Sequence, residues 1–336
     1  MVLGWILKLC SMLTGNYGVA IIIFTILIKA ALLPLTVKQQ KSMMKTQKLQ
    51  PLLMELQEKY KNDKDKLSQE TMKLYQKYQV NPMSGCLPML IQLPIIMMLY
   101  FVVRNPVIYI MGFGENDVWR IISAVIECSE TNPEIMTSFM TSLGIDSLDK
   151  LTADNYRMFG MYSIQIAKFL FDNPVVMENH WITEIGKNLE VINFGFLGLD
   201  LSQTPNLNAL FGVFVGKAHL LDLQTVLLWS IPALSGLSSY AVSKLSQAQN
   251  PQQPRKDENG EEAPNPMKSM MIFMPLMSAW IAFTLPAAVG LYWIISNILS
   301  MVQQVVLTKL ITPGISDEQI EGEILNAKKS RKKRKK

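Results

Sequence analysis

Lys29 is the residue whose type and position first suggest chemistry, because it lies in an otherwise apolar stretch from Gly18 to Val37. A lysine at the centre of a membrane-spanning helix costs about 2.5–3.5 kcal/mol on insertion scales. About nine residues, roughly 13 Å of helix, separate it from Lys38, which is too far for a lysine stem to cross. We therefore expect Lys29 to face a watery cavity that opens to the cytoplasm and attracts anionic groups. The alternative is snorkelling to the interface, which applies if the first span covers residues 9–28 instead.

Other polar side chains lie inside uncharged stretches of the chain. Thr25 precedes Lys29 by one turn and shares its helix face. The others are Gln92, Ser235, Ser238, Ser239, Ser296, Asn297 and Ser300. Each alone is explained by a hydrogen bond to its own helix or to a neighbour, but together with Lys29 they favour a polar groove. No Asp or Glu falls within these stretches, which argues against a proton relay.

The elements that must position these residues are membrane helices. The chain of 336 residues is 49% hydrophobic and 18% charged, whereas soluble chains carry about 25% charged residues. A bilayer core needs about 20 apolar residues per helix, and Pro286 and Gly290 divide the longest uncharged stretch in two. The sequence therefore predicts an all-α bundle of five transmembrane helices, at residues 18–37, 83–103, 223–243, 269–286 and 287–308.

The segments between the spans differ in charge. Residues 38–82 hold ten basic and five acidic residues. Residues 309–336 hold nine basic and four acidic residues, whereas residues 104–222 hold seven basic and fourteen acidic residues. By the positive-inside rule the first two segments are cytoplasmic, so the N-terminus lies outside and the C-terminus inside. Residues 1–17 then form an interfacial helix on the outer side, residues 104–222 an external region with a long insert at 105–193, and residues 244–268 a cytoplasmic loop.

Residues 38–82 have the pattern of a cytoplasmic helical hairpin. Leucines at 49, 52, 53 and 56 recur at helical spacing, and Leu67, Leu74, Tyr75 and Tyr78 do so after a charged break. Pro51 suits the first turn of a helix. The hairpin is either a docking arm or a long solvated loop, and the pattern favours the two equally.

Several functional classes are disfavoured by residue types. Three Cys and two His provide neither a disulfide framework nor a metal site, and no phosphate-binding Gly-Lys-Ser/Thr loop is present. We expect no catalytic residue, no cofactor and no DNA partner. A serine protease would need a histidine after Ser235-Gly236, and none follows within that span. A small-solute channel or transporter remains the alternative, although internal repeats and acidic coupling residues are missing.

Two sequence motifs resemble those of a known protein family. The run NPMSGCLPMLIQLP covers Asn81 to Pro94, and GLYW covers Gly290 to Trp293. With ILIKAALLPLTVKQQ in the first span and FLGLDLSQTP in the external region, they resemble the YidC/Oxa/Alb family of membrane protein insertases, over residues 17–103, parts of 194–205, and 226–308. The long external insert departs from the usual link in the family.

The resemblance implies a hydrophilic groove open to the cytoplasm and to lipid, in a bacterial cell membrane. Lys29 occupies the position of a cationic groove residue, usually Arg, and Thr25, Tyr292 and Trp293 match groove or substrate-contacting positions. Gln92 and Ser235 complete the expected groove set. The implied partners are nascent membrane proteins, the Sec translocon, membrane lipids and the ribosome. The basic tail that would bind ribosome or lipid comprises Lys328, Lys329, Arg331, Lys332, Lys333, Arg334, Lys335 and Lys336.

Overall fold

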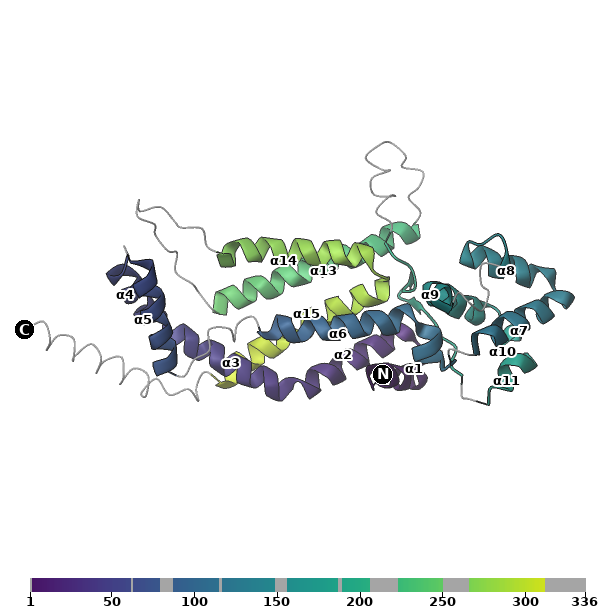
Figure 1. The fold of residues 1–336 in the computed structure, drawn as a ribbon, viewed down its shortest axis with the longest axis horizontal. Coiled ribbons are helices and arrows are strands. Elements are labelled where there is room, and N and C mark those ends of the chain that lie inside the picture. The colour runs from purple at the N-terminus through teal and green to yellow at the C-terminus, as the bar shows by residue number, and fades with distance from the viewer. Residues whose placement is uncertain are drawn as a thin grey trace, which may run out of the picture. The chain divides into compact units, whose positions relative to one another are not determined.

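The computed structural model describes residues 2–61, 63–78, 87–114, 117–148, 156–186, 189–205, 223–249 and 266–311. This part of the chain is mostly helical (Figure 1), as expected for an all-α membrane protein, with one two-stranded hairpin in addition. It divides into two compact units. Unit 1 comprises Met1–Lys29, Leu93–Ser239 and Met274–Ser296, and unit 2 comprises Ala30–Gln92, Tyr240–Phe273 and Asn297–Lys336.

Long apolar helices occur where uncharged stretches predict them. Among the described residues, α13 (Leu223–Gln249) and α15 (Ala287–Ile311) are long and apolar enough to cross a membrane. Helices α2 (Tyr17–Ala31) and α3 (Leu33–Lys48) meet that test only as a pair. Helices α6 (Leu87–Arg104) and α14 (Pro266–Thr284) contribute shorter apolar segments. Length and composition thus give two or three candidate spans in these ranges, and five spans stay a prediction.

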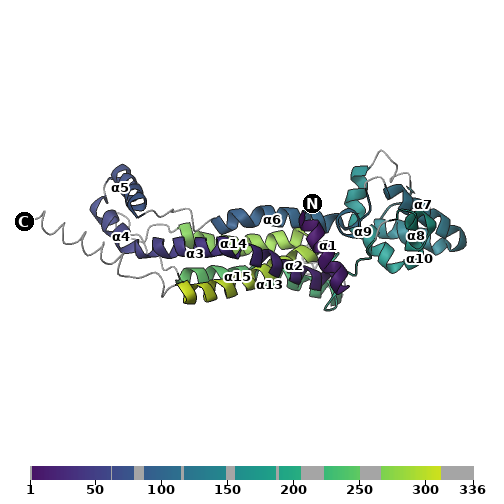
Figure 2. The same ribbon diagram turned by 90° about the horizontal axis from the view of Figure 1, so that it is seen from below.

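Helix α1 (Val2–Thr14) of unit 1 has two distinct faces. Gly4, Leu7 and Cys10 are buried, and a Cβ on Gly4 would lie 3.5 Å from side-chain atoms of Val102 and Tyr109. The opposite face leaves large apolar side chains exposed. Gly15, in the left-handed region at φ +62°, ends the helix, and the Asn16 side chain accepts a hydrogen bond from the Val19 amide as α2 begins. Figure 2 shows α1 running across the helices of unit 1.

Close helix contacts in the bundle of unit 1 depend on two glycines. A Cβ on Gly290 of α15 would lie 2.3 Å from Cγ2 of Ile231 on α13, far inside any contact distance. A Cβ on Gly236 of α13 would lie 3.2 Å from Cβ of Ala279 on α14. Small residues at helix contacts allow the backbones to approach, and dispersion contacts then stabilise the helix pair without a hydrophobic driving force from water.

A β-hairpin joins the ends of helices that are far apart in the sequence. Strand β1 (Gly195–Phe196) pairs antiparallel with β2 (Leu199–Asp200). The Tyr17 amide donates to the Asn193 carbonyl (3.1 Å), and the Ala288 amide donates to the Leu201 carbonyl (3.0 Å). The hairpin therefore satisfies backbone groups at the first turns of α2 and α15, which have no partners inside their own helices.

The described residues between α6 and α13 contain five further helices of unit 1. They are α7 (Val118–Thr131), α8 (Pro133–Leu143), α9 (Tyr156–Asp172), α10 (Pro174–Met177) and α11 (His180–Thr183). Phe139 of α8 and Phe169 of α9 pack edge to face at 4.9 Å. The Val107 amide, in the π-helical turn η2 (Val107–Met111), donates to the buried Ser163 hydroxyl of α9. These helices share one continuous core with α1, α2 and α15.

Asp200 connects helix α9 to the hairpin. Its carboxylate forms a salt bridge with Lys168 of α9 and accepts hydrogen bonds from the Ser202 amide and the Gln203 side chain. Burial alone would raise the pKa of this carboxyl, but the hydrogen bonds from Lys168 and Ser202 outweigh it and hold the pKa below its ordinary value. The ionised form is therefore stabilised by folding.

We expect Lys168→Met to destabilise the protein by about 1–2 kcal/mol at neutral pH, because the buried carboxylate of Asp200 loses a charged hydrogen bond. A group with a depressed folded-state pKa stabilises above its unfolded pKa, about 3.9, and this contribution disappears as pH falls through the folded value. The gap between variant and wild-type melting temperatures should therefore shrink below about pH 4. Lys73→Met, which removes a surface pair with Glu70, serves as the control, and an equal effect would contradict the argument.

Unit 2 contains the expected helical hairpin. Helix α4 (Gln50–Lys59) begins with Pro51 in its first turn, and α5 (Lys64–Lys77) begins at Asp63, whose side chain accepts from the Lys66 amide. Leu49 and Leu52 pack with Leu74, Tyr75 and Tyr78. In the same unit, the Gln40 amide of α3 donates to the Thr308 hydroxyl of α15 (3.0 Å), and that hydroxyl lies 3.0 Å from the Gln249 side-chain oxygen.

Candidate functional site

Lys29 lies in the last turn of α2, two residues before the helix ends at Ala31. The sequence predicts one continuous helix over 18–37 with Lys29 near its centre, but the structure interrupts it at Leu32. The physical reason is Pro34, which has no amide hydrogen to donate to the Ala30 carbonyl. The lysine is half-buried, and the negative end of the helix dipole favours a cation in this turn.

The side chains of Thr25 and Ser235 are both buried. The Thr25 hydroxyl donates to the Ile21 carbonyl of its own helix at 2.6 Å. Ser235 is fully buried in α13, and its hydroxyl has no hydrogen-bond partner among the described residues. One turn further, the Ser239 hydroxyl pairs with Ser278 of α14 at 2.9 Å, and Ser278 donates to the Met274 carbonyl. The Ser239–Ser278 pair thus places polar groups in the interior of an otherwise apolar bundle.

Tyr292 and Trp293 differ in exposure although they are adjacent. Tyr292 is 1% exposed and belongs to the main core of unit 1, whereas Trp293 is half-buried and packs against that core. Gln92 lies in α6 and belongs to unit 2, and its side chain is outside the described residues. The structure therefore brings Thr25, Lys29, Ser235, Tyr292 and Trp293 into one compact unit, and it does not bring Gln92 there. The basic tail, Lys328 to Lys336, also lies outside the described residues.

Two buried polar groups were not expected from the sequence. Ser278 lies in an uncharged stretch like the other serines, so its small polar side chain was the available signal. The Tyr17 hydroxyl is buried and has no hydrogen-bond partner in the described ranges; its ring packs edge to face on Phe194 at 5.2 Å. Nothing local in the sequence indicates this contact, because Phe194 lies far along the chain.

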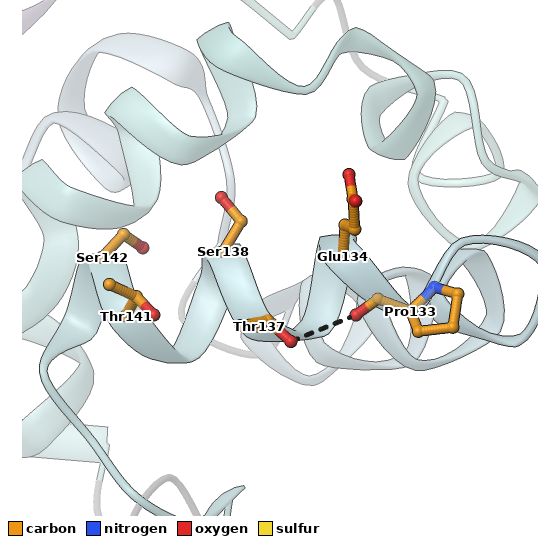
Figure 3. A pocket seen from close by; sticks show the side chains of 6 residues that line it. All are labelled: Pro133, Glu134, Thr137, Ser138, Thr141 and Ser142. Atoms are coloured by element: carbon orange, nitrogen blue, oxygen red, sulfur yellow. Dashed lines mark hydrogen bonds between the residues drawn. The ribbon is translucent and has the colours of Figure 1, made fainter.

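An open surface hollow occurs elsewhere, on helix α8. Figure 3 shows its lining, which comprises Pro133, Glu134, Thr137, Ser138, Thr141 and Ser142. The Thr137 hydroxyl turns back to the Pro133 carbonyl of its own helix. The hollow contains none of the expected groove residues. It is one exposed face of a single helix, and its hydroxyls are available to water.

The chain matches known proteins along most of its length. Residues 9–314 match the family described as 60Kd inner membrane protein. A protein of Pelobacter propionicus named Membrane protein insertase YidC is 28% identical over 300 residues, which cover 88% of this chain and 36% of the relative. A protein of the same name from Fusobacterium nucleatum is 51% identical over 106 residues, 32% of this chain and 52% of the relative.

A further relative matches over a shorter stretch of the chain. A Membrane protein insertase YidC of Syntrophus aciditrophicus is 65% identical over 85 residues, which cover 25% of this chain and 16% of the relative. In each of these alignments the chain spans about half of the relative's length or less. The family match nevertheless extends over most of the chain. The chain therefore belongs to the 60Kd inner membrane protein family, the family of the YidC insertases.

Proposed function

We propose that the chain is a membrane protein insertase, which transfers segments of nascent membrane proteins into the bilayer and assists their folding. The observation that carries the proposal is the half-buried Lys29 at the interrupted end of an apolar helix, in the same unit as the buried hydroxyls of Thr25, Ser235 and Ser239. The names of the relatives point to the same activity.

The proposed architecture has five spans. The first span would consist of α2 together with α3, and the other four would be α6, α13, α14 and α15. The N-terminus would lie outside and the C-terminus in the cytoplasm. The charge distribution supports this orientation, since the hairpin α4–α5 is rich in lysine and the external segment is acidic. The groove formed by the polar interior would open to the cytoplasm and to lipid.

The proposed mechanism requires no catalytic residue and no nucleotide. A short, acidic segment of the substrate enters the polar interior, attracted by Lys29, and thus avoids the full hydrocarbon thickness. The following apolar helix then partitions into lipid. Each Leu, Ile, Val or Phe at its centre contributes about 0.3–0.6 kcal/mol, so a whole helix supplies several kcal/mol.

The proposed partners follow from charge. The basic tail would bind the phosphates of ribosomal RNA or of anionic lipids, and the hairpin α4–α5 carries exposed lysines that would support the same contact. Cooperation with the Sec translocon belongs to the same proposal, as the resemblance to the insertase family implies.

Solvent labelling at position 29 tests the wet interior. In Lys29→Cys, we expect a membrane-impermeant maleimide added from the cytoplasmic side to react within minutes, because the thiol faces water. Val19→Cys, on the exposed apolar face of α2, should stay unlabelled in the same membranes. Protection of the thiol at position 29 to the level of position 19 would mean a dry span and would exclude the groove.

A further inference from the structure

The tip of the β-hairpin exposes a large apolar side chain in an unfavourable backbone conformation. Leu197 and Gly198 form the two-residue turn between β1 and β2, with φ +51° and +80°. Such turns favour Asn-Gly or Asp-Gly, since both central residues have positive φ. A leucine in the left-handed region is strained because its Cβ crowds the backbone, and the Leu197 side chain is 84% exposed. In water, both the backbone conformation of Leu197 and the exposure of its apolar side chain would therefore be unfavourable.

The hairpin holds this tip beside the junction of α1 and α2. The Asn16 side-chain amide donates to the Gly195 carbonyl at 2.8 Å. The Phe196 ring packs so tightly on Gly18 that an added Cβ would lie 2.3 Å from a ring carbon. Leu197 is the residue after Phe196. The contacts of Asn16 with Gly195 and of Gly18 with Phe196 therefore fix the position of Leu197 beside the junction of α1 and α2.

Helix α1 carries a second set of exposed apolar side chains at this junction. Trp5, Leu9, Met12 and Leu13 recur at helical spacing on one face, and Leu13, nearest the junction, is 78% exposed. Helix α2 continues the pattern on its own exposed face with Val19, Ile23, Ile26 and Leu27. We call Trp5, Leu9, Met12, Leu13 and Leu197 the interfacial patch.

We propose that the interfacial patch is a lipid-contacting surface, and that Leu197 inserts into the acyl-chain edge of the bilayer as an anchor for the hairpin. Continuity with the exposed apolar face of α2, a helix of the first candidate span, identifies the occupant as lipid. Helix α1 runs across α2 (Figure 2), which is the orientation of a helix lying in the membrane plane. No charged side chain belongs to the patch, so zwitterionic lipid would suffice.

The anchor would have a structural consequence for the bundle. The same hairpin accepts backbone hydrogen bonds at the starts of α2 and α15, so an inserted tip fixes the depth of both helices. Burial of the leucine side chain among acyl chains is favourable and would offset the cost of the left-handed turn.

Fluorescence quenching in nanodiscs of zwitterionic lipid tests the proposal without any insertion assay. The full chain would carry Leu197→Cys labelled with an environment-sensitive fluorophore, with Ile23→Cys as the lipid-facing control and Ser138→Cys, exposed on α8, as the water-facing control. The unsubstituted chain, labelled in parallel, gives the background from native cysteines. We expect the probe at 197 to be quenched by nitroxide-labelled lipid at least threefold more than the probe at 138, and to be protected from iodide.

Two results would overturn the proposal. Iodide quenching at 197 equal to that at 138 would place the tip in water. Protection from both iodide and lipid nitroxide would mean that protein, such as a second copy of the chain, covers the tip. Because both readouts are spectroscopic, a failure of the anchor would leave the insertase proposal standing, and the reverse also holds.

Discussion

Replacement of Lys29 with glutamate is expected to reduce insertion of a substrate with a short acidic external segment by at least tenfold. Two unit charges 8 Å apart at an effective dielectric constant of 20 interact by about 2 kcal/mol, and reversal of one charge changes attraction into repulsion. Lys29 also lies in the last turn of α2, where the helix dipole disfavours an anion. Both effects act against an acidic segment that enters the interior.

Matched variants separate charge from folding. Lys29→Arg should retain insertion, because it keeps the positive charge. The insertion level of Lys29→Gln should lie between those of Lys29→Arg and Lys29→Glu. Lys8→Glu reverses a half-buried lysine of α1, outside the proposed groove, and should insert normally. The measurement is substrate topology, scored by protease protection after depletion of the host insertase. A substrate whose external segment is made basic should be inserted better by Lys29→Glu than the acidic one.

Wild-type insertion of the acidic substrate by Lys29→Glu would contradict the proposed role of this residue. An equal loss for acidic and basic substrates would instead indicate a folding defect, which the amount of variant in the membrane and its melting temperature would show independently. The charge-swapped substrate is therefore the decisive control, since a misfolded protein cannot exchange one preference for the other.

Local patterns predicted several features of the fold. The divide at Pro286 separates α14, which ends at Thr284, from α15, which begins at Ala287. The charged break expected between the two hairpin helices lies where α4 ends at Lys59 and α5 begins at Lys64, and Pro51 lies in the first turn of α4. These features depend on the covalent geometry of proline and on nearby charges, so a short window of sequence contains the necessary information.

Features that depend on distant residues were not predicted. The hairpin at Gly195–Asp200 has strands of only two residues, and its stability depends on Tyr17 and Ala288, which lie far away in sequence. Helices α7 to α11, in the described part of residues 104–222, were not expected either. The interruption at Leu32 was missed although Pro34 was visible, because the apolar run on both sides suggested a single span.

The role of the candidate site residues stays a prediction, and their exposure could not be predicted from the sequence. Thr25, Ser235 and Tyr292 are buried, yet a cavity-lining role suggests contact with water. Which face of a helix is covered depends on its neighbours, and apolar spans have weak amphipathic patterns that do not indicate the covered face. Lys29 is the exception. Placing its charge in hydrocarbon is costly, so the sequence alone indicates polar surroundings for this side chain whichever face of the helix it occupies.

Gly290→Ala is expected to destabilise the bundle by about 1–3 kcal/mol, the usual cost of overpacking a close contact. The new Cβ would lie 2.3 Å from Cγ2 of Ile231, so α15 must move away from α13 or Ile231 must leave its rotamer. Ile231 is itself buried, so both routes disturb the core that contains Tyr292. The measurement is reversible unfolding in detergent, with melting temperature as a second readout.

A double-mutant cycle tests whether this one contact is responsible. Ile231→Ala removes Cγ2 and should cost about 2–5 kcal/mol alone through the cavity it creates. Combined with Gly290→Ala, the added methyl fills part of that space, so the double variant should be more stable than the sum of the single losses by about 1–2 kcal/mol. Gly4→Ala, where a Cβ meets its neighbours at 3.5 Å, should be tolerated. Strict additivity would show that the helices adjust elsewhere, and that Gly290 does not determine how closely α13 and α15 approach.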